Sequence, residues 1–235
     1  MKRAVILAGG KGTRLRPYTV ALPKPLMPVG EYPILEVIIR QLRKVGFTRI
    51  TLAVNHQADL FRAFFGDGSK WGIEIDYSLE TKALSTMGPL KLIADLPEHF
   101  LVMNGDILSD VPYGDFLDAH VAADRLFTIS ASRREQRVDY GVLRVNDAHD
   151  LCGFEEKPVI PFLVSMGIYA VSRKVLDAIP ADTPFGFDHL VLGYLRDGKK
   201  VHTVAHDGYW LDIGRPDDYE RAVDDWPMLA GRFAL

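Results

Sequence analysis

The sequence predicts an α/β fold in which helices pack on a mixed, mostly parallel β-sheet. Short apolar runs of strand length alternate with segments whose apolar residues recur every three or four positions, and this order is typical of a parallel sheet. A glycine-rich turn directly follows the first apolar run. At 235 residues and 48% hydrophobic composition, the chain is long enough to bury a sizeable core.

The first half of the chain carries the clearest alternation. Residues 4–7 form an apolar run typical of a buried strand. Apolar residues at 34, 35, 38, 42 and 45 have helical spacing, with Pro33 suited to a first turn and Gly46 suited to a helix end. The remaining expected elements of this half are strands at 50–54, 73–78 and 100–103 and a helix at 59–65.

The second half is richer in strands. We expect strands at 126–130, 140–145, 162–171 and 201–205, and helices at 173–179 and 187–196. Pro216 opens a last helix, and the carboxylates of Asp217 and Asp218 favour its first turn. No repeat, low-complexity tract or linker separates these elements, so we expect one domain.

The glycine turn indicates a site for a nucleoside triphosphate. Three glycines let the backbone approach a ligand and point N–H groups at it, and positive side chains follow at Lys11, Arg14, Arg16 and Lys24. A P-loop is excluded because Gly12 is followed by Thr-Arg-Leu-Arg-Pro, where Pro17 limits a helix. A dinucleotide fingerprint is excluded because the acidic residue at the required distance, Glu31, lies in a Gly-Glu-Tyr-Pro turn.

Five segments in order resemble one enzyme family. The glycine turn reads Gly-x-Gly-Thr-Arg-Leu-x-Pro and is followed by Pro-Lys-Pro at 23–25. The later segments are Leu-Val-Met-Asn-Gly-Asp at 101–106, Phe-Glu-Glu-Lys-Pro at 154–158, Met-Gly-Ile-Tyr at 166–169 and Tyr-Trp-Leu-Asp-Ile-Gly at 209–214. Together they resemble the sugar-1-phosphate nucleotidylyltransferases, most closely the mannose-1-phosphate guanylyltransferase branch. The resemblance covers nearly the whole chain.

The resemblance implies a Rossmann-like α/β/α sandwich and a Mg²⁺-dependent reaction. A nucleoside triphosphate and a sugar 1-phosphate would be the substrates, and a nucleotide sugar and pyrophosphate the products. We expect residues 1–110 to form the nucleotide-binding lobe of a single domain and residues 111–235 the sugar-phosphate-binding lobe, with an imprecise boundary near 110. Ligands of such sheets bind at the carboxyl ends of the strands.

Two aspartates are the expected Mg²⁺ ligands. Asp106 follows an apolar strand and ends Asn-Gly-Asp, which places its carboxylate at the ligand edge of the sheet. The resemblance implies Asp212 as the second carboxylate. Mg²⁺ prefers a few carboxylates, phosphate oxygens and retained waters to an all-protein cage.

The resemblance also assigns the remaining site residues. Arg14 is expected to bind the departing phosphates, Lys24 the α-phosphate and Lys157 the sugar phosphate, and with Asp106 they form the catalytic set. The expected nucleotide-binding residues are Leu7, Ala8, Gly9, Gly10, Gly12, Thr13, Glu80 and Gly88. The expected sugar-phosphate-binding residues are Asn104, Tyr140, Gly141, Glu156, Lys157, Gly167 and Asp188.

The segment expected to recognise the base departs from the family pattern. Relatives commonly read Leu-Gly-Thr-Ala-Gly-Pro-Leu, whereas this chain has Ser85 and Met87 at the second and fourth places, and we expect Met87 to narrow or reshape the nucleoside pocket. The guanylyltransferase-like remnant favours GTP. A uridylyl- or thymidylyltransferase and a catalytically silent, nucleotide-sugar-binding regulatory subunit remain as alternatives. The sugar is left open.

Composition limits the partners. A formal net charge of −3 argues against a general nucleic-acid binder, and no segment approaches the roughly 20 apolar residues that span a bilayer. Cys152, the single cysteine, fits a reducing cytoplasm, and the seven histidines show no metal-binding spacing. A homo-oligomer is compatible with the sequence but is not specified by it.

Overall fold

The structure, a computed structural model, describes residues 1–55 and 57–233. His56, one of the seven histidines, therefore lies outside the described residues. The strands are β1 Lys2–Leu7, β2 Pro28–Val29, β3 Tyr32–Pro33, β4 Phe47–Val54, β5 Glu74–Leu79, β6 His99–Asn104, β7 Ile107–Ser109, β8 Phe127–Arg137, β9 Val142–Val145, β10 Leu151–Glu155, β11 Val159–Ser172, β12 His202–His206 and β13 Trp210–Asp212. The helices are α1 Ile34–Lys44, α2 Ala58–Phe65, α3 Tyr113–Ala122, α4 Phe187–Arg196 and α5 Pro216–Phe233.

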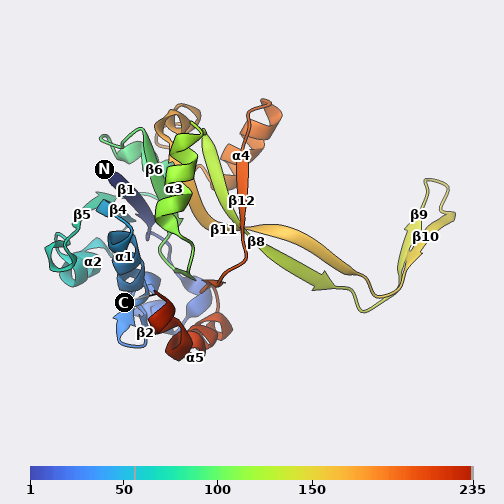
Figure 1. Cartoon of the computed structure of the whole chain (residues 1–235), viewed down its shortest axis with the longest axis horizontal. Coiled ribbons are helices and arrows are strands. Elements are labelled where there is room, and N and C mark those ends of the chain that lie inside the picture. The colour runs from blue at the N-terminus through green and yellow to red at the C-terminus, as the bar shows by residue number, and fades with distance from the viewer. Residues whose placement is uncertain (56, 234–235) are drawn as a thin grey trace.

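A seven-stranded sheet forms the centre of the molecule (Figure 1). Its strand order is β12-β8-β11-β6-β1-β4-β5. Only β11 runs against its two neighbours, β8 and β6, and the other adjacent pairs are parallel. The predicted mixed, mostly parallel sheet is confirmed.

Two apolar cores lie on opposite sides of this sheet. Alternation along β1 places Ala4 and Ile6 in the core that contains α1, α2, α3 and α5, and Val5 in the core that contains α4. All three side chains are fully buried. The helices therefore cover both sheet faces, as expected for an α/β/α sandwich.

Most predicted elements are present, and the differences have local causes. The helix predicted from residue 34 is α1, but Pro33 precedes it and pairs with Pro28 in a two-stranded ladder. The segment predicted as a helix at 173–179 is a 3-10 helix, Arg173–Ala178. Helix α3 was not predicted, although Tyr113, Phe116 and Leu117 with His120 make a buried helical stripe. The fourth member of this stripe, His120, is not apolar, so the apolar spacing alone did not indicate a helix.

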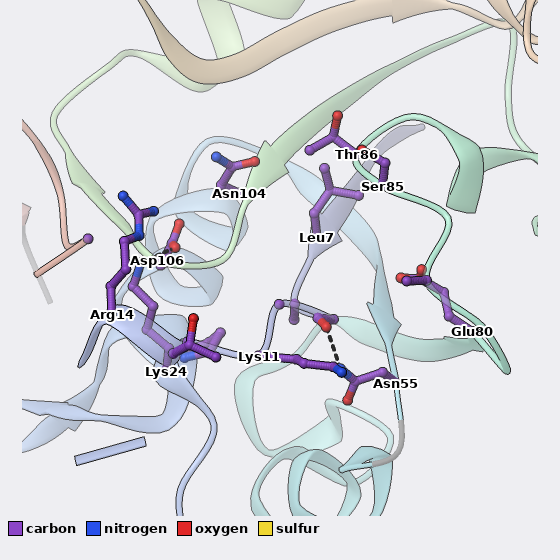
Figure 2. Close-up of a pocket in the computed structure, with 18 of the residues that line it drawn as sticks. Leu7, Lys11, Arg14, Lys24, Asn55, Glu80, Ser85, Thr86, Asn104 and Asp106 are labelled. Atoms are coloured by element: carbon purple, nitrogen blue, oxygen red, sulfur yellow. Dashed lines mark hydrogen bonds and ion pairs between the residues drawn. The ribbon is translucent and has the colours of Figure 1, made fainter. Parts of the chain in front are cut away.

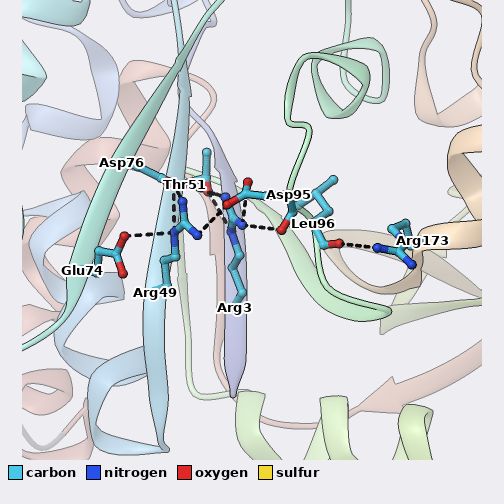
Figure 3. Close-up of polar contacts among 8 residues, drawn as sticks. All are labelled: Arg3, Arg49, Thr51, Glu74, Asp76, Asp95, Leu96 and Arg173. Carbon is cyan, nitrogen blue, oxygen red and sulfur yellow. Dashed lines mark hydrogen bonds and ion pairs between the residues drawn. The ribbon is translucent and has the colours of Figure 1, made fainter.

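A buried arginine joins strands at the amino end of the sheet (Figure 3). The Arg3 guanidinium, 3% exposed, donates to Thr51 on β4 at 2.7 Å, to Asp76 on β5 at 3.1 Å and to Asp95 at 3.0 Å. Arg49 bonds the same two carboxylates. This network fixes β1, β4 and β5 at the end of the sheet opposite to the glycine turn.

Strands β8 and β11 continue together beyond the body of the molecule (Figure 1). We call residues 133–163 the arm: the outer parts of β8 and β11, and between them the ladder β9–β10, which forms the tip. Residues 126–130 and 162–171 were predicted as strands, but their continuation as an arm was not. Within the residues that the structure describes, no helix is both long and apolar enough to cross a membrane.

Candidate active site at the carboxyl ends of β1 and β6

The glycine turn after β1 is held in place by neighbouring strands. The Ala8 N–H donates to the Ala53 carbonyl at 2.8 Å, and the Asn55 amide donates to the Gly9 carbonyl. Gly12 has φ +58°, a left-handed conformation that favours glycine, and its carbonyl accepts from the Thr19 hydroxyl at 2.6 Å. A side chain at Gly9 would collide with Glu80 Oε1, because its Cβ would lie 2.7 Å away. Glycine at position 9 therefore allows Glu80 to approach the turn.

The turn forms one wall of a cavity of about 750 Å³ (Figure 2). The lining brings together Leu7, Ala8, Gly9, Gly10, Lys11, Gly12, Thr13, Arg14, Lys24, Pro25, Asn55, Glu80, Thr81, Lys82, Ala83, Ser85, Thr86, Asn104, Asp106 and Gly214. Figure 2 shows Arg14, Lys24 and Asp106 at one end and Glu80 at the other. The cavity thus has a charged end and an end enclosed by the segment that follows β5.

The charged end is built around Lys24. This side chain is 8% exposed, on a 3-10 turn between Pro23 and Met27, and its ammonium donates to Asp106 and lies 3.9 Å from Asp212. Register explains how the two aspartates meet across the sequence, because Asp212 of β13 pairs with Ile107 of β7 and Ile213 N–H donates to the Asp106 carbonyl at 3.1 Å.

The two carboxylates fit a divalent cation. Asp106 Oδ1 is buried and has no hydrogen-bond partner. Burial, followed by the negative charge of Asp106, raises the pKa of Asp212. A second cation beside Lys24 would satisfy the buried oxygen and relieve the repulsion. No group of three or more His, Cys, Asp or Glu side chains with metal-binding geometry occurs among residues 1–55 and 57–233, so two carboxylates would have to share such an ion with phosphate oxygens and water.

Arg14 lies close to this pair of aspartates. Its guanidinium would be 3.7 Å from a Cβ at Gly214, so the absence of a side chain there leaves it room, and its charge lowers the pKa of Asp212 in opposition to burial. Arg14, Lys24 and Asp106, three of the four predicted catalytic residues, thus line the same end of the cavity.

The end at Glu80 combines a carboxylate with an unusual backbone. Burial raises the pKa of Glu80, and its Oε2 accepts from the Leu84 N–H at 3.3 Å. Ser85 adopts φ +63°, the left-handed region, at the place where relatives commonly have glycine. A serine in this conformation carries a backbone cost that glycine would not.

Met87 and Gly88, two residues of the segment predicted to recognise the nucleobase, lie beneath the cavity wall. The Met87 side chain is fully buried in the core on the α4 side and does not line the cavity, so the expectation that it narrows the pocket is wrong. Gly88 is also absent from the lining. A Cβ there would lie 2.9 Å from Leu84 Cβ and 3.2 Å from the Thr183 carbonyl oxygen, so the glycine permits close packing of this segment against residues 183–185.

Three predicted sugar-site residues lie at or beside the cavity. Asn104 lines it, and Gly167 lies directly behind, where a Cβ would be 2.6 Å from Asn104 Nδ2. Gly167 has φ +71° and lies in the irregular segment of β11 between its pairing at Ser165 and its pairing at Tyr169. Asp188 lies at the start of α4, next to Gly186 and behind Ser85. It does not line the cavity.

The other four predicted residues, Tyr140, Gly141, Glu156 and Lys157, lie on the arm, away from this cavity. Lys157 comes eight residues before Ser165 along the chain, which corresponds to roughly 25 Å of extended strand. The structure therefore does not bring them to the cavity of their own chain. The physical reason is that β8 and β11 stay paired as they leave the body, which carries the segment outward.

Several residues that line the cavity, among them Asn55 and Thr86, were not predicted from the sequence. Asn55 comes directly after β4, the strand next to β1, so its position at the carboxyl end of a parallel strand was an available signal. Thr86 is different, because its hydroxyl accepts from the Phe187 N–H at 2.7 Å and so connects the cavity wall to α4. No pattern in the sequence indicates that contact.

Comparison with known proteins finds relatives along nearly the whole chain. Residues 3–227 match the family model described as nucleotidyl transferase. The chain is 34% identical over 226 residues to a mannose-1-phosphate guanyltransferase of Schizosaccharomyces pombe, and 33% identical over 241 residues to a UTP–glucose-1-phosphate uridylyltransferase of Synechocystis sp.. These alignments cover 92% and 94% of this chain and 62% of each relative, so the chain spans about three fifths of the length of these curated relatives.

A solved structure has the same fold along the whole chain. HddC from Yersinia pseudotuberculosis, in a crystal structure complexed with GMP-PN, aligns with a TM-score of 0.71 and 27% sequence identity. The alignment covers 96% of this chain and 99% of that one.

Proposed function

Because this chain belongs to the nucleotidyl transferase family, in the group of sugar-1-phosphate nucleotidylyltransferases, we propose that it transfers a nucleotidyl group from GTP to a sugar 1-phosphate. The products are a GDP-sugar and pyrophosphate, and Mg²⁺ is the metal. The observation that carries the proposal is the charged end of the cavity, where Lys24 lies between Asp106 and Asp212 beside a glycine turn.

The reaction needs positioning and charge neutralisation rather than an enzyme nucleophile. An oxygen of the sugar phosphate attacks the α-phosphorus of the triphosphate, the bond from that phosphorus to the bridging oxygen breaks, and the bridging oxygen leaves with pyrophosphate. Lys24 neutralises the α-phosphate, and Arg14 offers paired donors to the departing phosphates. N–H groups of the turn from Gly9 to Thr13 support the same charges.

Asp106 and Asp212 would hold Mg²⁺, which would neutralise charge on the phosphate oxygens when bound. The partnerless Asp106 Oδ1 and the raised pKa of Asp212 support this role, since both show carboxylates that need a further cation. Without the metal, the Lys24 ammonium partly neutralises the carboxylates of Asp106 and Asp212 and orients them.

Glu80 supports guanine as the base. Guanine presents two adjacent donors, N1–H and the N2 amino group, on its Watson–Crick edge, and one carboxylate can accept from both. Uracil and thymine present one donor beside acceptors. Glu80 lies in the cavity wall at the end away from Lys24, where a base would reach when the triphosphate lies on the glycine turn.

The test is pyrophosphate release with Mg²⁺, using GTP, UTP, dTTP, ATP and CTP against mannose 1-phosphate and glucose 1-phosphate. The proposal expects release that depends on the acceptor and is fastest with GTP. Release with UTP or dTTP instead would favour a uridylyl- or thymidylyltransferase. Binding of a triphosphate without release from any pair would favour a regulatory subunit.

Glu80→Gln separates base recognition from catalysis. Glutamine offers one acceptor and one donor, the pattern that suits uracil and thymine, so kcat/KM for GTP relative to UTP should fall by about 10-fold or more. Glu74→Gln, an exposed carboxylate on β5 outside the cavity, is the matched control. An unchanged ratio in Glu80→Gln would remove Glu80 from base recognition.

A further inference from the structure

Four residues that the sequence assigns to the sugar phosphate meet at one place on the arm. Tyr140 and Gly141 directly precede β9, and Glu156 and Lys157 directly follow β10, so both pairs lie at the junction between the tip and the β8–β11 ladder. A Cβ at Gly141 would lie 3.2 Å from Glu156 Oε2, and the Val138 N–H donates to the Pro158 carbonyl at 3.0 Å. Folding thus assembles these residues, but away from the cavity of their own chain.

The arm is an ordered ladder rather than a loose loop. Pairing between β8 and β11 runs without interruption from Leu163–Arg133 to Val159–Arg137. It begins where both strands are part of the central sheet, so bringing Lys157 back to its own cavity would require bending or breaking this ladder. The ladder therefore holds the junction away from the body (Figure 1). Eight residues of extended chain, roughly 25 Å, separate Lys157 from Ser165.

The tip has an apolar face that nothing in the described chain covers. Leu143 pairs with Phe154 and Val145 with Leu151 across the β9–β10 ladder, which places these four side chains on one face. Each is between 53% and 62% exposed. A two-stranded ladder is marginal in water by itself and needs a packing surface. A partner that covered this face would therefore stabilise the tip.

Exposed apolar side chains continue along the arm. Besides the four tip residues, Tyr140 and Phe162 are 79% and 42% exposed, and Val159, Ile160 and Leu163 on β11 are about half exposed. Because side chains alternate along a strand, Val159 and Leu163 lie on one face of the β8–β11 ladder and Ile160 and Phe162 on the other. Over both faces these nine side chains expose on the order of 800 Å², which is what each partner buries in a stable interface, so a partner that covers the arm must enclose both faces.

The cavity lacks the complementary part. Two of its four lining cations are already paired, Lys24 with Asp106 and Lys82 with Asp182 at 2.6 Å. Lys11 and Arg14 line the wall formed by the glycine turn, where the proposed function places the triphosphate. Condensing a triphosphate with a sugar phosphate brings two multiply charged anions together, so a further cation beside Asn104 would favour the reaction. Lys157 carries that charge at the end of an arm.

We propose that the arm of one copy packs on a second copy of this chain and delivers Lys157, with Glu156, to the sugar-phosphate side of the second copy's cavity. The exchange is reciprocal, so a two-fold dimer contains two composite active sites, each with the glycine turn, Lys24 and Asp106 from one copy and Lys157 from the other. Lys157 acts in trans on the attacking phosphate, and the apolar face of the tip holds the arm in place. The inference deepens the proposed function and rests on it.

Mixing two inactive variants tests delivery in trans. Asp106→Asn removes the metal carboxylate but keeps the arm, and Lys157→Ala keeps the cavity but loses the arm cation. Each alone should release pyrophosphate at least about 100-fold more slowly than the unmodified protein. Co-expressed in equal amounts, they should form mixed dimers with one intact site, which restores about one quarter of the unmodified activity per chain.

The mixture discriminates sharply between the two arrangements. If Lys157 served its own chain, every site in the mixture would lack one of the two groups, and activity would stay at the level of the separate variants. That result would overturn the proposal, and so would near-normal activity of Lys157→Ala alone.

Particle mass gives a second, activity-independent test. Light scattering on a sizing column should give twice the chain mass of 26.3 kDa for the unmodified protein and a single chain mass for the double variant Leu143→Lys, Phe154→Lys. Leu192→Lys is the matched control, since Leu192 on α4 is 64% exposed but lies outside the arm, and it should stay dimeric. A single-chain mass for the unmodified protein, or a dimer that survives loss of the tip face, would overturn the arm exchange.

The two measurements also separate this inference from the proposed function. If the unmodified protein released no pyrophosphate with any substrate pair, the proposed function would fail, whereas the particle mass and its dependence on Leu143 and Phe154 would still decide whether the arm joins two copies.

Discussion

The chemistry proposed for this chain depends on a few charges around Lys24. Its ammonium bonds Asp106 and lies 3.9 Å from Asp212, yet Asp106 Oδ1 remains buried without a partner. An unsatisfied buried oxygen costs free energy, and such costs concentrate at functional sites. At the residue scale, the proposed function accounts for this cost, because a bound cation would satisfy the buried oxygen.

Asp106→Asn should reduce pyrophosphate release by at least about 100-fold, because the amide supplies no negative charge for a metal. Circular dichroism and thermal melting should show an intact fold. Asp118→Asn, which removes a carboxylate from the exposed pair with Lys2, should retain full activity. Near-normal release from Asp106→Asn would contradict the metal assignment.

Asp212→Asn should stabilise the protein at neutral pH while reducing activity. The pKa of Asp212 is raised in the folded state, so between the unfolded and the folded pKa the native state binds the proton more tightly. The contribution of Asp212 to the free energy of unfolding therefore falls as pH rises from the unfolded-state pKa through the folded-state pKa, and it is lowest at higher pH. Urea unfolding at pH 7 and at pH 3 should show a gain for the variant only at pH 7. An equal difference at both pH values would mean that ionisation of Asp212 is not the cause.

Ser85 should tolerate glycine but not a β-branched residue. Its φ of +63° is strained for any side chain and most for valine, so Ser85→Val should lower the free energy of unfolding by about 1–2 kcal/mol. Ser85→Gly should leave it unchanged or raise it slightly, since relief of strain offsets the entropy of glycine. Urea titrations decide this, and equal stability of the two variants would show that the strain is absent in solution.

Elements owe their positions to contacts that cross the sequence. The ladder between β7 and β13 brings Asp106 and Asp212 to one point, and Thr86 connects the cavity wall to α4 through the Phe187 N–H. At the opposite end of the sheet, Arg3 ties β1 to β4, β5 and the segment at Asp95. The register of the strands around the cavity depends on such links.

Arg3→Met should lower the free energy of unfolding by about 2 kcal/mol, because the buried Thr51 hydroxyl and two carboxylates lose their charged donor. Asp76 and Asp95 keep Arg49 and partial solvation, which limits the loss. Lys2→Met, which breaks an exposed ion pair one residue away, should cost less than about 1 kcal/mol. A similar loss in both variants would show that the network adds nothing beyond surface pairing.

The whole molecule divides into a packed body and an arm. No residue between 133 and 163 belongs to either buried core, so the body does not need the arm to fold. The arm in turn exposes apolar side chains that the body leaves uncovered. This division arises because β8 and β11 are longer than the other strands of the central sheet and extend past its edge.

Replacing residues 139–157 by a short glycine-containing turn should leave a folded body that melts in one cooperative transition. GTP should bind within about threefold of its normal Kd, because the arm contributes nothing to the lining of the cavity. Acceptor-dependent pyrophosphate release should fall at least about 100-fold, because the sugar phosphate loses its cation. Loss of GTP binding would instead assign the arm to nucleotide recognition.

The sequence by itself determined what depends on neighbouring residues. Periodicity and turn chemistry located α1 and α4 and most strands of the sheet. The glycines and Asp106 marked the cavity because they follow predicted strands closely, and Lys24 was selected from its Pro-Lys-Pro motif. Helix α3 escaped prediction because its buried stripe includes His120.

The tertiary structure alone decided which distant segments meet. Strand register joined Asp212 to Asp106, and packing placed Met87 in the core rather than in the cavity. Nothing in local sequence shows that β8 and β11 stay paired past the sheet, and that pairing moves Lys157 away from its own site. The physical reason is that strand pairing and burial are set by partners far along the chain, whereas propensity and spacing report only on neighbours.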